Sequence, residues 1–209
     1  MNWGLLKAAV VDYINRGDIT PALMSRMLPI AEQRIFDGTS YTGQVVEGLR
    51  LMSMLTEIDP FTVGVLPADF LGAHRVARVS GGRVVQLQYL GPQNFAKLEG
   101  QASQSDFYTV RGSTLILAGL QSTQVELLYF ARPVSPIADA DTNAVMTRAQ
   151  AVYLYSMLWE VANWLRDKDR AGQYASLFMD AMVSAQKADD SRVSDGGPLV
   201  ITADLGVRV

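Results

Sequence analysis

The stretch from Thr147 to Asp190 constrains the fold most, because it reads as a helical hairpin whose first helix is apolar on nearly every side. Thr147 and Gln150 have the spacing of a capping box, which predicts the start of this helix. Such a helix has to be covered by other parts of the protein on most sides. Ser156 and Glu160 interrupt it well before the run of about 18 apolar residues that a membrane span needs. Its apolar residues form two stripes, Leu154, Leu158, Val161 and Leu165 in one and Tyr155, Trp159 and Ala162 in the other.

The second helix of the hairpin follows a charged turn, Asp167–Arg170, and is amphipathic. Small residues on its inward face permit a close approach to the first helix. The residues expected to face inward are Ala171, Tyr174, Phe178, Ala181 and Ala185. We interpret the hairpin as a scaffold.

The bulk composition excludes several classes of protein. With 49% hydrophobic and 19% charged residues, the chain of 209 residues suits one large or two small soluble domains. A net charge of -3 argues against a tight, sequence-reading DNA-binding protein, which needs a basic face. The absence of cysteine excludes a disulfide framework and any cysteine nucleophile or metal ligand.

The N-terminal part predicts two further helices. The first runs from Trp3 to Arg16 and is amphipathic. The second has Thr20 as its N-cap and Pro21 at its first position, and it ends at Asp37-Gly38. Pro29 lies inside it, so we expect a kink or a split there.

The middle of the chain changes to the two-residue period of strands. Two-residue turns, Gly81-Gly82 and Gly112-Ser113, predict two hairpins. Short strands at this spacing are typical of a small sandwich or open barrel. The predicted strands are 49–59, 73–80, 83–90, 107–111, 114–117 and 124–132, with a helical turn at 93–98. The first of these also fits a helix, through Leu51, Leu55 and Ile58, and we interpret it as a strand.

These elements together predict an α+β fold. We expect a helical bundle, made of the N-terminal helices and the C-terminal hairpin, with a small antiparallel β domain inserted into it. The boundaries are residues 1–45 and 140–194 for the discontinuous helical domain and residues 46–139 for the β domain. Residues 195–209 are expected to form an extended C-terminal tail, because Gly196, Gly197 and Pro198 break the last helix and the residues beyond are mostly apolar.

No pattern of catalytic or ligand-binding residues emerges. His74 is the only histidine, and we interpret it as a surface or packed residue rather than a general base. Asp139–Asn143 copies the first half of an EF-hand loop, but Ala144 and Gln150 replace its glycine and its bidentate glutamate. We therefore predict a solvated acidic linker at this position, and no catalytic, cofactor-binding or metal-binding residue in the chain.

The order of several weak motifs resembles one known family, the head-to-tail adaptor (connector) proteins of tailed phages, the group that includes tail tubular protein A. The resemblance covers nearly the whole chain, apart from the stretch between Asp37 and Glu47. The segments that carry it are Ala31–Ile35, Leu66–Phe70, Leu127–Pro133, Val152–Tyr155, Asp167–Ala171 and Gly196–Leu199.

The resemblance implies a structural protein of the virion without enzymatic activity. Such adaptors form a ring, usually a dodecamer, between the portal and the tail or nozzle protein. They extend the channel through which genomic DNA passes, and they sit at the head-tail junction after assembly in the host cytoplasm. The resemblance also implies that the C-terminal segment docks on the portal; the alternative is a tail that folds back as an edge strand on its own β segment. The residues expected to do so are Gly196, Gly197, Pro198, Leu199, Val200, Ile201 and Leu205.

Two alternative functions remain at this stage. One is a tail-associated cell-wall hydrolase, which the lack of a catalytic cluster disfavours. The other is a β module that binds host glycans, with Tyr89, Tyr108 and Tyr129 as stacking residues. All three tyrosines fall on predicted inward positions of strands, which favours core packing instead.

Overall fold

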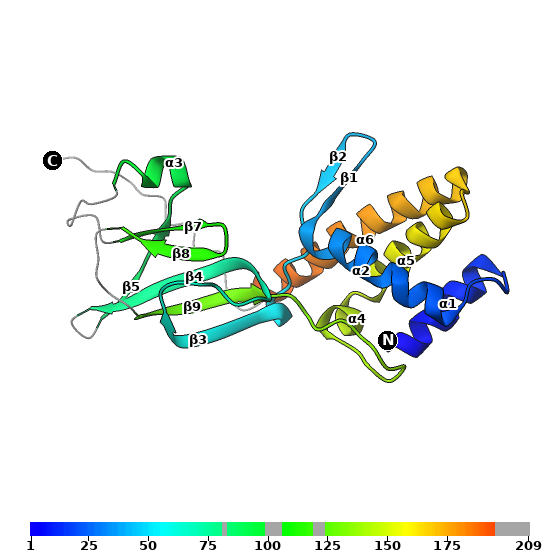
Figure 1. Cartoon of the computed structure of the whole chain (residues 1–209), viewed down its shortest axis with the longest axis horizontal. Coiled ribbons are helices and arrows are strands. Elements are labelled where there is room, and N and C mark those ends of the chain that lie inside the picture. Colours follow the sequence, from blue (N-terminus) through cyan, green and yellow to red (C-terminus); the bar gives the residue numbers. More distant parts are fainter. Residues whose placement is uncertain (81–82, 99–105, 119–123, 195–209) are drawn as a thin grey trace.

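The computed structural model describes residues 1–80, 83–98, 106–118 and 124–194. Helices gather at one end of its long axis and small sheets at the other (Figure 1). The mixed α+β fold predicted from the sequence is confirmed. None of the described helices is both long and apolar enough to span a bilayer.

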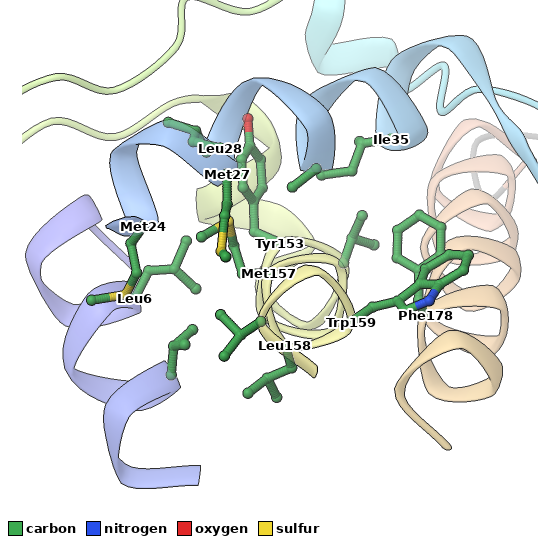
Figure 2. Close-up of a cluster of buried hydrophobic side chains, with 14 of the residues drawn as sticks. Leu6, Met24, Met27, Leu28, Ile35, Tyr153, Met157, Leu158, Trp159 and Phe178 are labelled. Atoms are coloured by element: carbon green, nitrogen blue, oxygen red, sulfur yellow. The ribbon is translucent and has the colours of Figure 1, made fainter. Parts of the chain in front are cut away.

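Helix α5 forms the centre of the helical part. Figure 2 shows α5 end-on, with α1 on one side, α2 above it and α6 on the other side. Tyr153, Met157, Leu158 and Val161 of α5 are fully buried, as expected for a helix that is apolar on nearly every side. The helices are α1 (Trp3–Ile14), α2 (Pro21–Asp37), α4 (Ala144–Arg148), α5 (Gln150–Trp164) and α6 (Lys168–Ser194).

The start of α5 differs from the prediction. The side chain of Asn143 caps the short helix α4 by accepting the N–H of Met146 at 2.9 Å. Thr147 lies inside α4, and its hydroxyl donates to the carbonyl of Asn143. The chain then turns at Ala149, so α5 begins at Gln150 without a side-chain cap. The predicted N-cap at Thr147 is therefore wrong, because an upstream asparagine initiates a separate turn of helix.

The N-terminal helices agree with the sequence more closely. Thr20 caps α2 by accepting the N–H of Leu23 at 3.2 Å, with Pro21 at the first helical position, as predicted. Helix α2 continues through Pro29, so the helix is not split there. Asn15 ends α1 in the left-handed conformation, two residues before the predicted Gly17.

The β part consists of two sheets that share one core. One sheet has the order β3-β9-β4-β5 and the other the order β6-β7-β8, which agrees with the predicted small sandwich. The core residues come from both sheets: Phe61, Leu66, Val76, Leu87, Tyr108, Leu115, Val125, Leu127 and Tyr129. The elements are η1 (Met52–Met54), β3 (Leu55–Thr62), β4 (Phe70–Ser80), β5 (Arg83–Gln86), β6 (Gln88–Tyr89), α3 (Pro92–Phe95), β7 (Phe107–Arg111), β8 (Thr114–Leu117) and β9 (Gln124–Ala131).

Two predicted strands are shorter than expected. The strand predicted over residues 49–59 begins only at Leu55, since Leu49 and Leu51 pack into the helical core instead. The strand predicted over residues 83–90 breaks at Leu87, where the chain passes from one sheet to the other. This change of sheet turns Tyr89 outward, and its 56% exposure makes the inward prediction wrong for this residue.

A β-hairpin between the two parts was not predicted. Strands β1 (Thr39–Tyr41) and β2 (Gln44–Val46) pair antiparallel and project from the helical part (Figure 1). Thr42 and Gly43 form its turn with positive φ angles of 48° and 83°. The hairpin leans on the helices through Tyr41, whose ring meets that of Trp159 edge-on at 5.6 Å.

Trp159 provides a test of the helical core. It is 7% exposed, and its ring centroid lies 5.9 Å from that of Phe178. We expect Trp159→Ala to lower the free energy of unfolding by about 3–5 kcal/mol, because the truncation leaves a cavity. Urea denaturation measures this loss. Trp164→Ala, at a position that is 48% exposed, is the matched control and should cost much less. Equal losses for the two variants would contradict the packing described.

Candidate assembly site

The linker from β9 to α4, residues 133–143, is attached to the start of α1. The ammonium group of Lys7 pairs with the carboxylate of Asp139 at 2.5 Å, and the N–H of Gly4 donates to the Asp139 carbonyl at 2.9 Å. A Cβ atom at Gly4 would lie only 3.0 Å from the Asp139 Cβ atom. Glycine at this position therefore allows the linker to approach the helix closely.

Asp141 shapes the same linker from within. Its carboxylate accepts the N–H groups of Ile137 at 2.9 Å and Ala138 at 2.8 Å, and these bonds hold the pKa of Asp141 below its usual range. Within the described part of the chain, no cluster of carboxylate and histidine side chains is suited to hold a metal ion. The half EF-hand motif thus serves as a structural turn, in which both aspartates bind protein groups.

The linker presents two aliphatic side chains to solvent. Val134 is 84% exposed and Ile137 is 87% exposed, the two highest values among the large hydrophobic residues that the structure describes. Pro136, between them, is buried. We call residues 134–137 the apolar loop.

A buried polar cluster holds the apolar loop against α2 and α5. The hydroxyl of Tyr153 donates to the carboxylate of Glu32 at 2.8 Å and accepts a bond of 2.8 Å from the amide of Asn143. The hydroxyl of Ser135, inside the apolar loop, donates to the other Glu32 oxygen. Burial raises the pKa of Glu32, and burial together with the neighbouring carboxylate raises that of Tyr153. These polar groups form hydrogen bonds with one another, so their role is to position the apolar loop.

A second surface lies on the opposite side of α5. It is a groove of about 520 Å³ between β2 and α6, and we call it the β2–α6 groove. Val45, at its edge, is 77% exposed, and Val183 of α6 is 43% exposed. The groove is lined by Val45, Val46, Glu47, Gly48, Leu49, Arg50, Met182, Val183, Gln186 and Lys187.

The base of the β2–α6 groove is the crossing between the helical and the β parts. Arg50 donates to the carbonyl oxygens of Phe36 and Leu49 at 2.8 Å each and of Leu71 at 3.2 Å. A Cβ atom at Gly48 would lie 1.9 Å from the Phe36 oxygen, so only glycine fits there. This crossing gives the groove a fixed shape.

Helix α6 closes the crossing from the other side. The carboxylate of Asp189, which is 5% exposed, accepts the N–H of Met52 at 2.5 Å. The side-chain oxygen of Gln186 accepts the N–H of Arg50 at 3.4 Å. The last turns of α6 are thereby tied to the segment that leads into β3.

The β part has a more polar hollow of about 460 Å³ where the chain changes sheets. Tyr89 and Tyr108 line it, and their ring centroids are 5.6 Å apart. Tyr129 is 3% exposed and donates to Asp69 instead, so the three predicted stacking tyrosines do not form one platform. His74 also lines the hollow and packs edge-on against Phe130, which agrees with a surface residue.

The residues predicted to dock on the portal, from Gly196 to Leu205, lie outside the described residues. Neither the apolar loop nor the β2–α6 groove was predicted from the sequence. The isolated Val134 and Ile137 in a proline-containing linker are the signal that points to the loop. The groove leaves no local signal, since its two walls are far apart in the sequence.

Residues 1–202 match the protein family described as SU10 adaptor protein. The chain belongs to the SU10 adaptor protein family. No curated protein matches the sequence. The match spans the helical part, the β part and most of the C-terminal segment. It confirms the resemblance to phage head-to-tail adaptors. Membership of this family supports a structural phage protein with an adaptor role, and it implies interaction with phage portal and tail proteins.

The buried carboxyl group of Glu32 predicts a pH dependence of stability. Because its pKa is raised in the folded protein, the folded state holds this proton to higher pH, and stability falls as the pH rises above about 4.5. Glu32→Gln keeps an acceptor for Tyr153 and removes the ionisation. We expect the melting temperature of the variant, relative to wild type, to increase between pH 4.5 and 7.

Tyr153→Phe is the companion variant for this experiment. It removes the hydroxyl that bonds the ionised carboxylate of Glu32, so it should make the loss of stability with rising pH steeper than in wild type. A change of about 1 kcal/mol corresponds to about 2–4 °C in a domain of this size. A Glu32→Gln variant that is equally destabilised at every pH would contradict the raised pKa.

Proposed function

We propose that the protein forms a ring, twelve-fold in the usual manner of such adaptors, beneath the portal and joins the capsid to the tail or nozzle. The supporting observation is the family match over residues 1–202. The ring extends the DNA channel at the head-tail junction of the virion, after assembly in the host cytoplasm. Exposed apolar side chains on two sides of the helical part support contacts with neighbouring subunits.

The charge of the protein suits a channel through which DNA moves. The chain carries 18 lysine and arginine residues against 21 aspartate and glutamate residues. A strongly cationic lining would bind phosphates and release counterions, which holds DNA in place. A weakly acidic subunit allows genomic DNA to pass without specific contacts.

The C-terminal segment is the proposed portal-docking element. Leu199, Val200, Ile201 and Leu205 follow Gly196-Gly197-Pro198, a sequence that cannot continue α6. An apolar segment of this kind can add a strand to the sheet edge of another protein and place alternate side chains in its pockets. Helix α6, which precedes this segment in the chain, would then connect the ring to the portal.

Ending the chain after Asp195 tests this docking. We expect the truncated protein to keep its melting temperature, because the buried cores of the helical and β parts are built by residues between Trp3 and Met182, all of which it retains. It should fail to co-sediment with the portal protein of the same phage, and virions carrying it should lack tails. A full-length variant with Leu199→Ser, Ile201→Ser and Leu205→Ser separates apolar docking from chain length and should fail in the same way. A truncated protein that still co-sediments with the portal would contradict the docking role.

A further inference from the structure

The helical part carries a protruding apolar surface on one side and a recessed one on the other. Ser135 bonds the apolar loop to Glu32 of α2, and Asp139, two residues after the loop, ties the linker to the start of α1 through Lys7 and Gly4. Helix α6 forms one wall of the β2–α6 groove. Figure 2 shows that α1 and α6 lie on opposite sides of α5, and Figure 1 shows the linker and the β1–β2 hairpin at opposite edges of the molecule. The loop therefore cannot reach the groove of its own chain.

The two surfaces have matching chemistry. The apolar loop offers two aliphatic side chains, Val134 and Ile137, and aliphatic side chains of β2 and α6 line the groove. Asp139, which pairs with Lys7, and Asp141 follow the loop, and Lys187 and Glu47 line the groove beside its aliphatic side chains, so both surfaces have polar rims. Apolar contact at the centre and a polar rim are features of a specific protein interface.

Both surfaces keep their shape without a partner. The bonds from Asp141 to the backbone and from Ser135 to Glu32 fix the loop, and the contacts of Arg50 and Gly48 fix the base of the groove. A preformed surface loses little conformational entropy when it binds, which favours association. It also explains why two large aliphatic side chains can stay exposed instead of folding onto the nearby core.

We propose that in the assembled ring the apolar loop of one copy inserts into the β2–α6 groove of the next copy. The contact is heterologous, because it joins two different surfaces on opposite sides of one domain, and its repetition around an axis closes a ring. The proposal rests on the proposed ring function and names the residues that connect its subunits. Stable interfaces bury about 800 Å² on each partner, so this small contact forms part of a larger one that assembles on the portal.

Cysteine cross-linking tests the contact directly, because the native chain contains no cysteine. One preparation carries Ile137→Cys and a second carries Val183→Cys, so that a disulfide between them joins two copies. The two are mixed, assembled on the portal and oxidised. We expect covalent dimers on a non-reducing gel, and a ladder of higher oligomers when both substitutions are in one chain. Ile137→Cys paired with Leu177→Cys is the matched control, since Leu177 is on α6, is 41% exposed and does not line the groove.

The outcomes separate this contact from the ring itself. Rings that are visible by electron microscopy but give no Ile137–Val183 cross-link would overturn the contact and leave the proposed function standing. A disulfide between Val183→Cys and Ile201→Cys within one copy in the assembled ring would assign the groove to the C-terminal segment and also overturn it. Failure of the unsubstituted protein to form any ring on the portal would overturn the proposed function and the contact together.

A charge substitution gives a second readout. Ile137→Asp should leave the melting temperature unchanged, because the side chain is 87% exposed, and should reduce the yield of rings at least about tenfold. Combining it with Val183→Lys should restore part of this yield, since the new charges then meet across the interface. An Ile137→Asp protein that forms rings as well as wild type would contradict the proposal.

Discussion

The fold depends on the burial of α5 from all sides. Its stripe around Tyr153 and Met157 faces α1 and α2, and its Trp159 faces α6 and the tip of the β1–β2 hairpin. Because one helix serves all these neighbours, it fixes the position of α1 relative to α6 and of the hairpin relative to both. The apolar loop and the β2–α6 groove are held on opposite sides of the molecule by the same packing.

The charged groups near α5 are used to orient it. Arg34 of α2 pairs with Glu160 of α5 and stacks over the Trp159 ring at 4.0 Å. Glu32, two residues earlier on α2, accepts a hydrogen bond from Tyr153, which lies about two turns before Glu160 on α5. Glu32 is 4% exposed and the Arg34 side chain 22% exposed, and this burial raises the pKa of Glu32 and lowers that of Arg34. Such pairs add little net stability, but losing one partner leaves a buried charge, so they favour a single register of α2 on α5.

The sequence predicted those features of the fold that depend on the spacing of apolar residues and on local turns. The helical hairpin, the Thr20 cap and both β-hairpins with two-residue turns follow from patterns a few residues long. Three features were missed. Asn143, rather than Thr147, begins the helix before α5. The chain changes sheets directly after Leu87, whose N–H still donates to the Val76 carbonyl of β4 at 2.8 Å, while the N–H of Gln88 donates to the Asp106 carbonyl beside β7 at 2.7 Å. The β1–β2 hairpin has strands of only three residues each, too short to show a period.

The candidate site was missed for a related reason. The β2–α6 groove joins residues 45–50 to residues 182–187, and its shape depends on the approach of Gly48 to the Phe36 carbonyl, which no pattern in the sequence reveals. In the linker, the acidic residues suggested a solvated segment, whereas Asp139 and Asp141 bind α1 and the loop backbone. An exposed aliphatic pair on a segment secured in this way is costly for a protein that stays monomeric, because it gains nothing from burial. A subunit whose protruding and recessed apolar surfaces lie on opposite sides can bury one against the other in a neighbouring copy, and repetition of that contact about an axis is the geometry of a ring.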